Sequence, residues 1–293
     1  EALEDKLRAK ALDITPENLE KTIYKRWDLL KSIYSDFKKL CQTDLKMKPD
    51  VMLPTLWNLW LPLATQIASR YQKKQSPFIQ GILGGQGTGK TTTCKVISLI
   101  LSHLKYRTLS LSIDDLYKTY QARLILQQQD PRLIWRGPPG THDVDLGLNL
   151  LDNILHRQTT ITVPRFDKSL HSGNGDRTSP ETVENIDIVL FEGWFVGSIP
   201  IETAAFNTPP LPILTEADKQ FARDMNDKLH DYLPLWQRLD SLIVLYPKDY
   251  RLSLEWRKQA EHQMKASGKT GMTDLQIERS EERRVGKECR SRW

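Results

Sequence analysis

The chain has 293 residues, 39% of them hydrophobic and 27% charged, a composition typical of a soluble globular protein with one large or two modest domains. No apolar run is long enough to span a bilayer, and no charged segment followed by an apolar run opens the sequence. We therefore expect no membrane partner and no secretory signal. The formal net charge of +5 includes +3 from residues 279–293, and a remainder near +2 without a basic stripe argues against nucleic-acid binding.

The C-terminal segment RSEERRVGKECRSRW (279–293) resembles the in-frame translation of a sequencing-library adapter. We therefore treat it as a non-native tail, exclude it from the fold and expect the natural C-terminus to be missing. Cys41 and Cys94 lie outside the tail and are too widely spaced for a disulfide framework or a metal-binding pair. Such cysteine usage is typical of a reducing, intracellular compartment.

Residues 1–75 are predicted to form an N-terminal helical segment. Thr15, Pro16 and Glu17 form a helix start, and a second helix is expected from about Pro54 to Tyr71. Apolar residues recur along the first helix at spacings of three and four: Leu19, Ile23, Trp27, Leu30, Tyr34 and Phe37. We expect this stripe to pack against the rest of the protein rather than form a partner groove, because a long exposed apolar stripe favours aggregation.

Residues 76–278 are predicted to form one α/β domain, because short apolar runs alternate there with helical segments. Strands are expected over 78–83, 107–114, 161–167, 186–194 and 241–247, and helices over 90–104, 120–129, 144–156 and 250–266. The runs over 186–194 and 241–247 are almost continuously apolar, which indicates strands buried on both faces of a parallel sheet. The pattern predicts a three-layer α/β fold with a mostly parallel central sheet.

A glycine-rich loop, GGQGTGKT, follows the first of these strands and fits the pattern G-x-x-x-x-G-K-[ST] at every fixed position. In such a loop the backbone N–H groups face phosphates, Lys90 reaches the β- and γ-phosphates, and the Thr91 hydroxyl can ligate Mg²⁺. A strand before the loop and a helix after it predict a P-loop NTPase fold that uses ATP and Mg²⁺. The predicted nucleotide-binding residues are Gly84, Gly85, Gln86, Gly87, Thr88, Gly89, Lys90, Thr91 and Thr92.

Two adjacent carboxylates end the second predicted strand in the sequence SIDDLY. The carboxyl edge of a parallel sheet is where ligands bind, so a carboxylate there can accept a hydroxyl proton or hold Mg²⁺ through water. Adjacent side chains leaving a strand point in opposite directions, so one of Asp114 and Asp115 should face the site. The alternative is a helix-capping pair, and both interpretations hold together if Asp114 acts in catalysis and Asp115 caps.

Glu192 follows another apolar strand, in the sequence VLFEGW. An ionised carboxylate in that position is costly unless it is paired or lies near a metal ion, so we predict a Walker B role in magnesium binding and catalysis. An exposed glutamate at a strand end is the simpler alternative.

The order of these motifs resembles the D-glycerate 3-kinase family of plants and cyanobacteria, within the phosphoribulokinase, uridine kinase and pantothenate kinase group. The match runs from about Pro77 to Met272, and GTHD, PRFDKS and GDR give it family-level specificity. The resemblance implies an ATP-dependent kinase that converts D-glycerate to 3-phosphoglycerate, as in photorespiratory salvage. It also implies that Asp114 is the catalytic base and that Arg257 lies on a lid helix near the phosphates. The compartment would be the bacterial cytoplasm, or the chloroplast if the source is a plant.

Three polar loops supply the candidates for the acceptor site. A small anion such as glycerate requires a cation for its carboxylate and partners for its two hydroxyls, and a bidentate arginine suits the carboxylate best. The predicted substrate-binding residues are Asp115, Arg136, His142, Asp143, Arg165, Lys168 and Arg177. Each of them alone is also compatible with a structural loop role.

Other functions of a P-loop stay open at this point. A GTPase would require an N-K-x-D motif and a D-x-x-G motif, and neither is present. A uridine or pantothenate kinase-like enzyme, or a nucleotide-gated binding protein without acceptor chemistry, uses the same loop. The sequence does not determine the oligomeric state.

Overall fold

The computed structural model describes residues 9–10, 14–133, 136–209 and 213–247, and in addition residues 249, 252, 255, 258 and 262. Within these ranges no helix is both long and apolar enough to cross a membrane. The predicted helix over 250–266, Arg257 and the tail over 279–293 lie outside the described residues or are described only at single positions.

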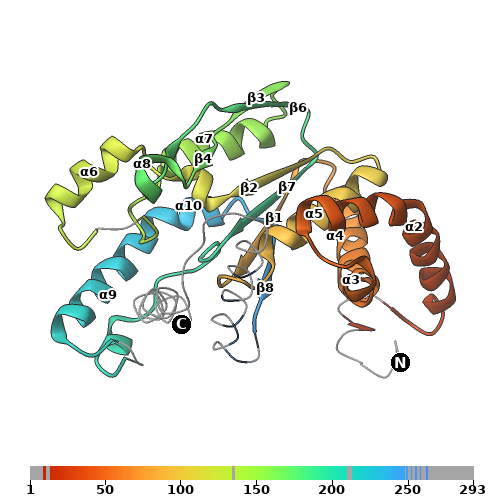
Figure 1. Ribbon diagram of the computed structural model, residues 1–293, viewed down its shortest axis with the longest axis horizontal. Coiled ribbons are helices and arrows are strands. Elements are labelled where there is room, and N and C mark those ends of the chain that lie inside the picture. The colour runs from red at the N-terminus through yellow and green to blue at the C-terminus, as the bar shows by residue number, and fades with distance from the viewer. Residues whose placement is uncertain are drawn as a thin grey trace. The chain divides into compact units, whose positions relative to one another are not determined.

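The central sheet has four strands, which are hydrogen-bonded in the order β2-β7-β1-β8 (Figure 1). They are β1 (Phe78–Gly84), β2 (Thr108–Ser112), β7 (Ile188–Gly193) and β8 (Ser241–Leu245). β1 and β8 pair in parallel, from Gln80 with Ser241 to Gly84 with Leu245. The chain is therefore an α/β protein with a parallel central sheet, as the sequence predicts.

One prediction about these strands was wrong. We expected the run over 241–247 to be buried on both faces, yet Leu242 and Val244 are 40% and 53% exposed. β8 is the last strand in the sheet order, so one of its sides has no neighbouring strand among the described residues. An apolar run alone does not distinguish such an edge strand from a central one.

The chain divides into two compact units. The first comprises residues 1–78, 91–110 and 185–190. Its helices are α2 (Leu19–Leu40), α3 (Pro49–Thr55), α4 (Leu61–Lys74) and most of α5 (Lys90–His103), with π-helical turns over Cys41–Leu45 and Leu56–Trp60. The helix expected from about Pro54 thus begins earlier, at Pro49. The limits of a separate N-terminal segment at residues 1–75 remain a prediction.

The apolar stripe of α2 is buried only toward its C-terminal end. Leu30 and Phe37 are buried, and the Phe37 ring packs 6.4 Å from that of Trp60. Ile23 and Trp27 are 41% and 50% exposed, so the expectation that the whole stripe packs inward was wrong. The Trp60 indole N–H donates to the Thr93 hydroxyl at 3.2 Å, which joins the helices of this unit in its core.

The second unit comprises residues 79–90, 111–184 and 191–293 and contains the predicted site. Its longer helices are α6 (Tyr120–Gln129), α7 (Val144–Leu155) and α9 (Glu216–Lys228). Its shorter helical elements are η3 (Ile113–Leu116), α8 (Leu170–Gly173), η4 (Thr203–Phe206), η5 (Leu229–Tyr232) and α10 (Leu233–Trp236). α6 and α7 begin and end close to where the sequence predicts.

Two small antiparallel pairings follow α7 (Figure 1). β3 (Thr160–Val163) pairs with β6 (Glu181–Glu184), and β4 (Phe166–Asp167) pairs with β5 (Asp176–Arg177). The extended piece predicted over 161–167 is therefore divided between β3 and β4, because Pro164 has no N–H to donate to a ladder. These pairings bring Arg165, Lys168 and Arg177 into one arm of the chain.

A cluster of aromatic side chains forms part of the core of the same unit. Phe191 and Phe195 are fully or almost fully buried, and Tyr232 packs against Phe195 with ring centroids 5.1 Å apart. Trp236 stacks on Tyr232, and its indole N–H donates to the Ser198 carbonyl at 3.0 Å. These large buried rings pack into a dense core, and the loops of the site extend from that core.

Candidate active site

The phosphate-binding loop connects β1 to α5. Gly87 and Gly89 have φ angles of 77° and 84°, which side chains other than glycine rarely adopt. A Cβ on Gly84 would lie 2.6 Å from the Thr88 hydroxyl and 3.1 Å from Cβ of Leu245, so this position has no room for a side chain. The loop is therefore shaped by its glycines at three separate positions.

Internal hydrogen bonds hold the loop in place. The Lys90 ammonium and the Thr88 hydroxyl both donate to the Gly85 carbonyl, each at 2.8 Å. Lys90 is the first residue of α5, where the helix N-terminus presents free N–H groups and a partial positive charge to an anion. Gln86 lies at the tip of the loop, and Thr91 and Thr92 continue the first turn of the helix.

The carboxylates of SIDDLY lie in a short 3₁₀ helix rather than in the strand itself. Ser112 begins η3 with a capping box: its hydroxyl accepts the Asp114 N–H at 3.3 Å, and the Asp115 carboxylate accepts the Ser112 N–H at 3.0 Å. β2 therefore ends at Ser112, two residues before the predicted end. Asp115 is the N3 residue of this capping box, with Ser112 as the N-cap, whereas the Asp114 carboxylate takes no part in the cap.

Each carboxylate has its own cation. The Lys168 ammonium lies 2.5 Å from Oδ2 of Asp114, and Nη1 of Arg165 donates to Oδ2 of Asp115 at 3.0 Å. Burial raises the pKa of Asp114, but the charge and hydrogen bond of Lys168, together with smaller contributions from the electrostatic effect of His142 and the hydrogen bond of Tyr117, lower it by more, so the net effect is a lowered pKa. Burial also raises the pKa of Asp115. Hydrogen bonds from backbone N–H groups and the Arg165 guanidinium lower this pKa, but by less than burial raises it. The more strongly ionised of the two is thus Asp114.

Glu192 lies near the end of β7, one residue before Gly193. A Cβ on Gly193 would lie 2.6 Å from Cγ2 of Ile113, which immediately precedes Asp114. The end of β7 is therefore in contact with η3, the helical turn that follows β2. This contact brings the segments that carry Glu192 and Asp114 together. Glu192 is half-buried and takes part in at least one interaction.

The arginines of the polar loops are engaged within the protein. Arg165 also donates from Nη2 and Nε to Oε2 of Glu181, at 2.6 and 2.9 Å. Arg177 donates to Asp143 at 2.9 Å and to the Tyr117 carbonyl at 2.9 Å. Arg136 donates to the Gly173 carbonyl at 2.5 Å. Arg165 and Arg177 thus tie the arm to the body of the unit in the state described.

Asp143 and His142 lie in the RGPPGTHD loop, which runs beside Tyr117. Asp143 caps α7 by accepting the Leu146 N–H at 3.1 Å. His142 is 2% exposed and stacks on the Tyr117 ring with centroids 4.3 Å apart. Burial lowers the pKa of His142 to about 3, so its imidazole is neutral at physiological pH.

Tyr232 is the hydrogen-bond partner of the His142 ring. The Tyr232 hydroxyl oxygen accepts the Gly140 N–H at 2.9 Å and lies 2.8 Å from Nδ1 of His142, a contact in which either atom can donate. Because this oxygen already accepts the Gly140 N–H, we expect it to donate its own proton to Nδ1, with the imidazole hydrogen on Nε2. Nε2 is buried, and within the described part of the chain it has no hydrogen-bond partner.

Sequence reasoning did not select two residues of this site. Tyr117 is fully buried, and its hydroxyl is hydrogen-bonded to Asp114, which helps to keep that carboxylate ionised. Tyr232 comes from η5, about ninety residues after His142 in the chain, and no local pattern joins the two. For Tyr117 a signal existed, because it stands in the SIDDLY motif itself.

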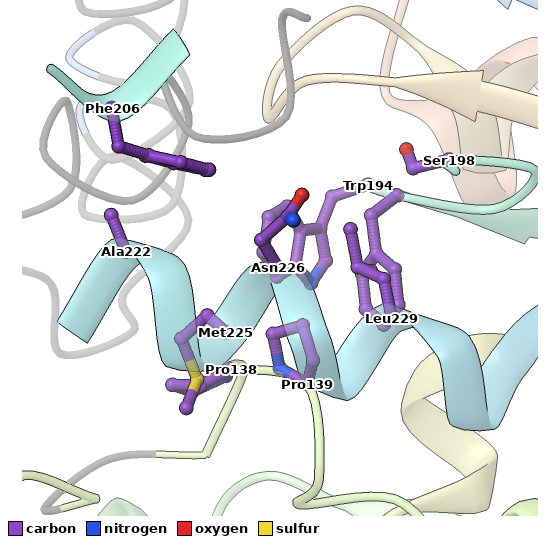
Figure 2. A pocket seen from close by; sticks show the side chains of 10 residues that line it. Pro138, Pro139, Trp194, Ser198, Phe206, Ala222, Met225, Asn226 and Leu229 are labelled. Atoms are coloured by element: carbon purple, nitrogen blue, oxygen red, sulfur yellow. The ribbon is translucent and has the colours of Figure 1, made fainter. Parts of the chain in front are cut away.

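A pocket of about 40 Å³ lies next to the RGPPGTHD loop in the same unit. Figure 2 shows Met225 next to Pro138, and Trp194 and Leu229 among the other lining side chains. Asn226 is polar but already pairs with the backbone of Ile201 at 2.8 and 3.0 Å. The apolar lining does not suit a small carboxylate, so we do not assign the acceptor to this pocket.

Mg²⁺ requires oxygen ligands, and the candidate ligands in this site are two carboxylates and a threonine hydroxyl. The described residues include no group of three His, Cys, Asp or Glu side chains that would hold a metal ion on its own. Magnesium in nucleotide sites is held by one or two carboxylates together with phosphates and water. Asp114 and Glu192 on adjoining segments fit that pattern, as does a hydroxyl at Thr91 directly after the P-loop lysine.

No model of a known protein family matches the chain. An uncharacterized kinase of Schizosaccharomyces pombe, mug58, is 32% identical over 213 residues, which are 69% of this chain and 76% of that protein. A chloroplastic D-glycerate 3-kinase of Arabidopsis thaliana is 31% identical over 212 residues, 69% of this chain but 44% of that protein. The solved structure of a D-glycerate 3-kinase from Cryptococcus neoformans var. grubii matches with a TM-score of 0.69 and 28% identity, over 77% of this chain and 86% of that one.

Fold, glycine loop and sequence relatives agree. A parallel sheet with a P-loop after β1, carboxylates directly after β2 and a carboxylate at the end of β7 is the architecture of a P-loop kinase. The chain belongs to the family of P-loop kinases that includes the proteins named D-glycerate 3-kinase.

Proposed function

We propose that the protein is an ATP-dependent kinase for a small hydroxy acid, most specifically D-glycerate, and that the product is 3-phosphoglycerate. The single observation that carries the proposal is the Asp114 carboxylate, which lies in η3 directly after β2 and has a lysine ammonium 2.5 Å from one of its oxygens. An ionised carboxylate next to a cation suits an acceptor that has both a hydroxyl and a negative charge.

In the proposed reaction Asp114 accepts the proton of the acceptor hydroxyl while that oxygen attacks the γ-phosphorus. The bond between this phosphorus and the β,γ-bridging oxygen breaks, and ADP leaves. The amide N–H groups of the P-loop and the Lys90 ammonium orient the phosphates and stabilise their charge. When bound, Mg²⁺ would be held by Thr91 and Glu192, with Asp114 reaching it only through water, and it would neutralise phosphate charge.

The test is an acceptor screen with Mg-ATP. We expect D-glycerate to stimulate ADP formation, with L-glycerate, glycerol, pantothenate and uridine much weaker, and we expect phosphorus NMR to place the phosphate on the C3 oxygen. Lys90→Ala should abolish transfer and leave the fold intact, because Lys90 is a surface-accessible ligand for phosphate rather than a core residue. Phosphorylation of pantothenate or uridine in preference to glycerate would contradict the proposal, as would full turnover in Lys90→Ala.

A further inference from the structure

We propose that Lys168 is a latch that occupies the Asp114 carboxylate until an anionic acceptor draws it away. The inference rests on the function proposed above and adds the specificity element of that site. In the described state the Lys168 ammonium lies 2.5 Å from Oδ2 of Asp114, and the Tyr117 hydroxyl is also hydrogen-bonded to the same carboxylate. An acceptor hydroxyl has to displace the ammonium before it can donate its proton to that oxygen.

The neighbouring cations do not share this arrangement. Arg165 pairs with Asp115 and Glu181, and Arg177 pairs with Asp143, so each of them holds a carboxylate with a structural role. Lys168 instead pairs with the carboxylate that is placed to accept the proton. Among these three cations, Lys168 is thus the one whose release changes the reacting group.

The side chain of Lys168 can also change position while its backbone stays in place. Lys168 directly follows β4, whose pairing with β5 fixes this part of the arm. The ion pairs of Arg165 and Arg177 anchor the end of this pairing that lies away from Lys168. Its side chain is 60% exposed, whereas that of Asp114 is 23% exposed. The lysine ammonium stands on a flexible four-carbon stem that is largely exposed, so it can change partners by side-chain rotation alone.

A hydroxy acid supplies both groups that the exchange requires. Its carboxylate takes the Lys168 ammonium, and its hydroxyl takes the Asp114 oxygen that the ammonium leaves. A neutral polyol has no anion to offer, so Lys168 stays on Asp114 and the hydroxyl is not deprotonated. In the absence of acceptor the same contact keeps Asp114 from activating water, which limits wasteful hydrolysis of ATP.

The test uses Lys168→Met, the charge-preserving variant Lys168→Arg, and Lys219→Met as the matched control. Lys219 pairs with Glu216 at 2.8 Å on the surface of α9, so its loss changes the net charge equally and leaves the site alone. For Lys168→Met we expect the KM for D-glycerate to rise about 10- to 100-fold, the usual effect of removing a hydrogen bond between charged groups. The KM for ATP should be unchanged, and the preference for D-glycerate over glycerol should fall by a similar factor.

The second readout needs no acceptor. Hydrolysis of ATP in the absence of any acceptor should rise severalfold in Lys168→Met, stay near the wild-type rate in Lys168→Arg, and be unaffected in Lys219→Met. A folded Lys168→Met protein with unchanged glycerate KM and unchanged background hydrolysis would overturn the latch while leaving the proposed function intact. A wild-type protein that ignores D-glycerate would overturn the proposed function, and background hydrolysis would then still decide whether Lys168 restrains Asp114.

Discussion

At the scale of single residues, the site shows how burial and hydrogen bonding determine protonation. Asp114 and Asp115 are neighbours in the chain, yet Lys168 lowers the pKa of the first and burial raises that of the second. The sequence SIDDLY predicts that a carboxylate faces the site and that its neighbour serves as a cap, but it does not contain the partners. Those come from residues 165 and 168, which the β4–β5 pairing brings back to this place.

His142 provides a prediction at the same scale. Its pKa is lowered to about 3 in the folded chain, against an ordinary value of 6.5. A histidine with a depressed folded-state pKa contributes stability that is present above pH 6.5 and is lost as the pH falls toward 3. At pH 5.5 the unfolded state gains about 1.4 kcal/mol from protonating this residue.

The measurement is nitrogen NMR of labelled histidine, with denaturant unfolding at pH 7.5 and pH 5.5 beside it. We expect a neutral His142 with its proton on Nε2 at both pH values, and in Tyr232→Phe a partial shift of the proton to Nδ1, because the phenol that donates to Nδ1 is gone. A positively charged His142 at pH 5.5 in the folded protein would contradict this assignment.

At the scale of secondary-structure elements, regular elements could be predicted and contacts between distant elements could not. The strands β1 and β7 and the helices α5, α6 and α7 follow from apolar periodicity and flanking glycines. β6 has the sequence ETVE, which has no apolar face, and it becomes a strand only by pairing with β3. α9 could have been found, because Thr215 and Asp218 form a capping box at its start.

The contact between β7 and η3 gives the prediction at this scale. In Gly193→Ala the new methyl group would lie 2.6 and 3.0 Å from Cγ2 and Cβ of Ile113, and side-chain rotation cannot move that Cβ away. We expect a loss of about 1–3 kcal/mol in the free energy of unfolding. We also expect a fall of about 10- to 100-fold in kcat, because Ile113 immediately precedes Asp114 and small misplacements of a reacting group are costly.

Gly81→Ala is the matched control. Its methyl group would meet the Cδ1 atoms of Leu242 and Leu239 at 2.9 and 3.0 Å, and neither leucine belongs to η3. The free energy of unfolding should fall in this variant too, whereas kcat should stay close to the wild-type value. Equal kcat in Gly193→Ala and Gly81→Ala would show that the β7 contact does not position Asp114.

At the scale of the whole molecule, the sequence predicts the α/β architecture and the kinase family, while the acceptor is harder to predict. A glycine loop is local and has a fixed spacing, so its phosphate-binding function can be predicted from the sequence alone. The groups that we propose for the acceptor lie in the RGPPGTHD loop, in η3 and in the β4–β5 arm, and only the fold brings these segments together. The match covers 44% of the Arabidopsis relative, which is therefore more than twice as long as the matched segment. For this reason D-glycerate is only a proposed substrate of this chain.

The most direct test of the central claim is the turnover number of Asp114→Asn with D-glycerate, measured together with the dissociation constant of Mg-ATP. Asparagine keeps the shape of the side chain but cannot accept the proton, so kcat should fall by about 10²- to 10⁴-fold. The affinity for Mg-ATP should change by no more than a few-fold, because the P-loop and Lys90 remain, and Asp115→Asn should lower kcat only a few-fold. Near wild-type turnover in Asp114→Asn, with Asp115→Asn inactive, would contradict the account, and an equal loss of Mg-ATP affinity in both variants would make the pair a metal site instead of a base and its cap.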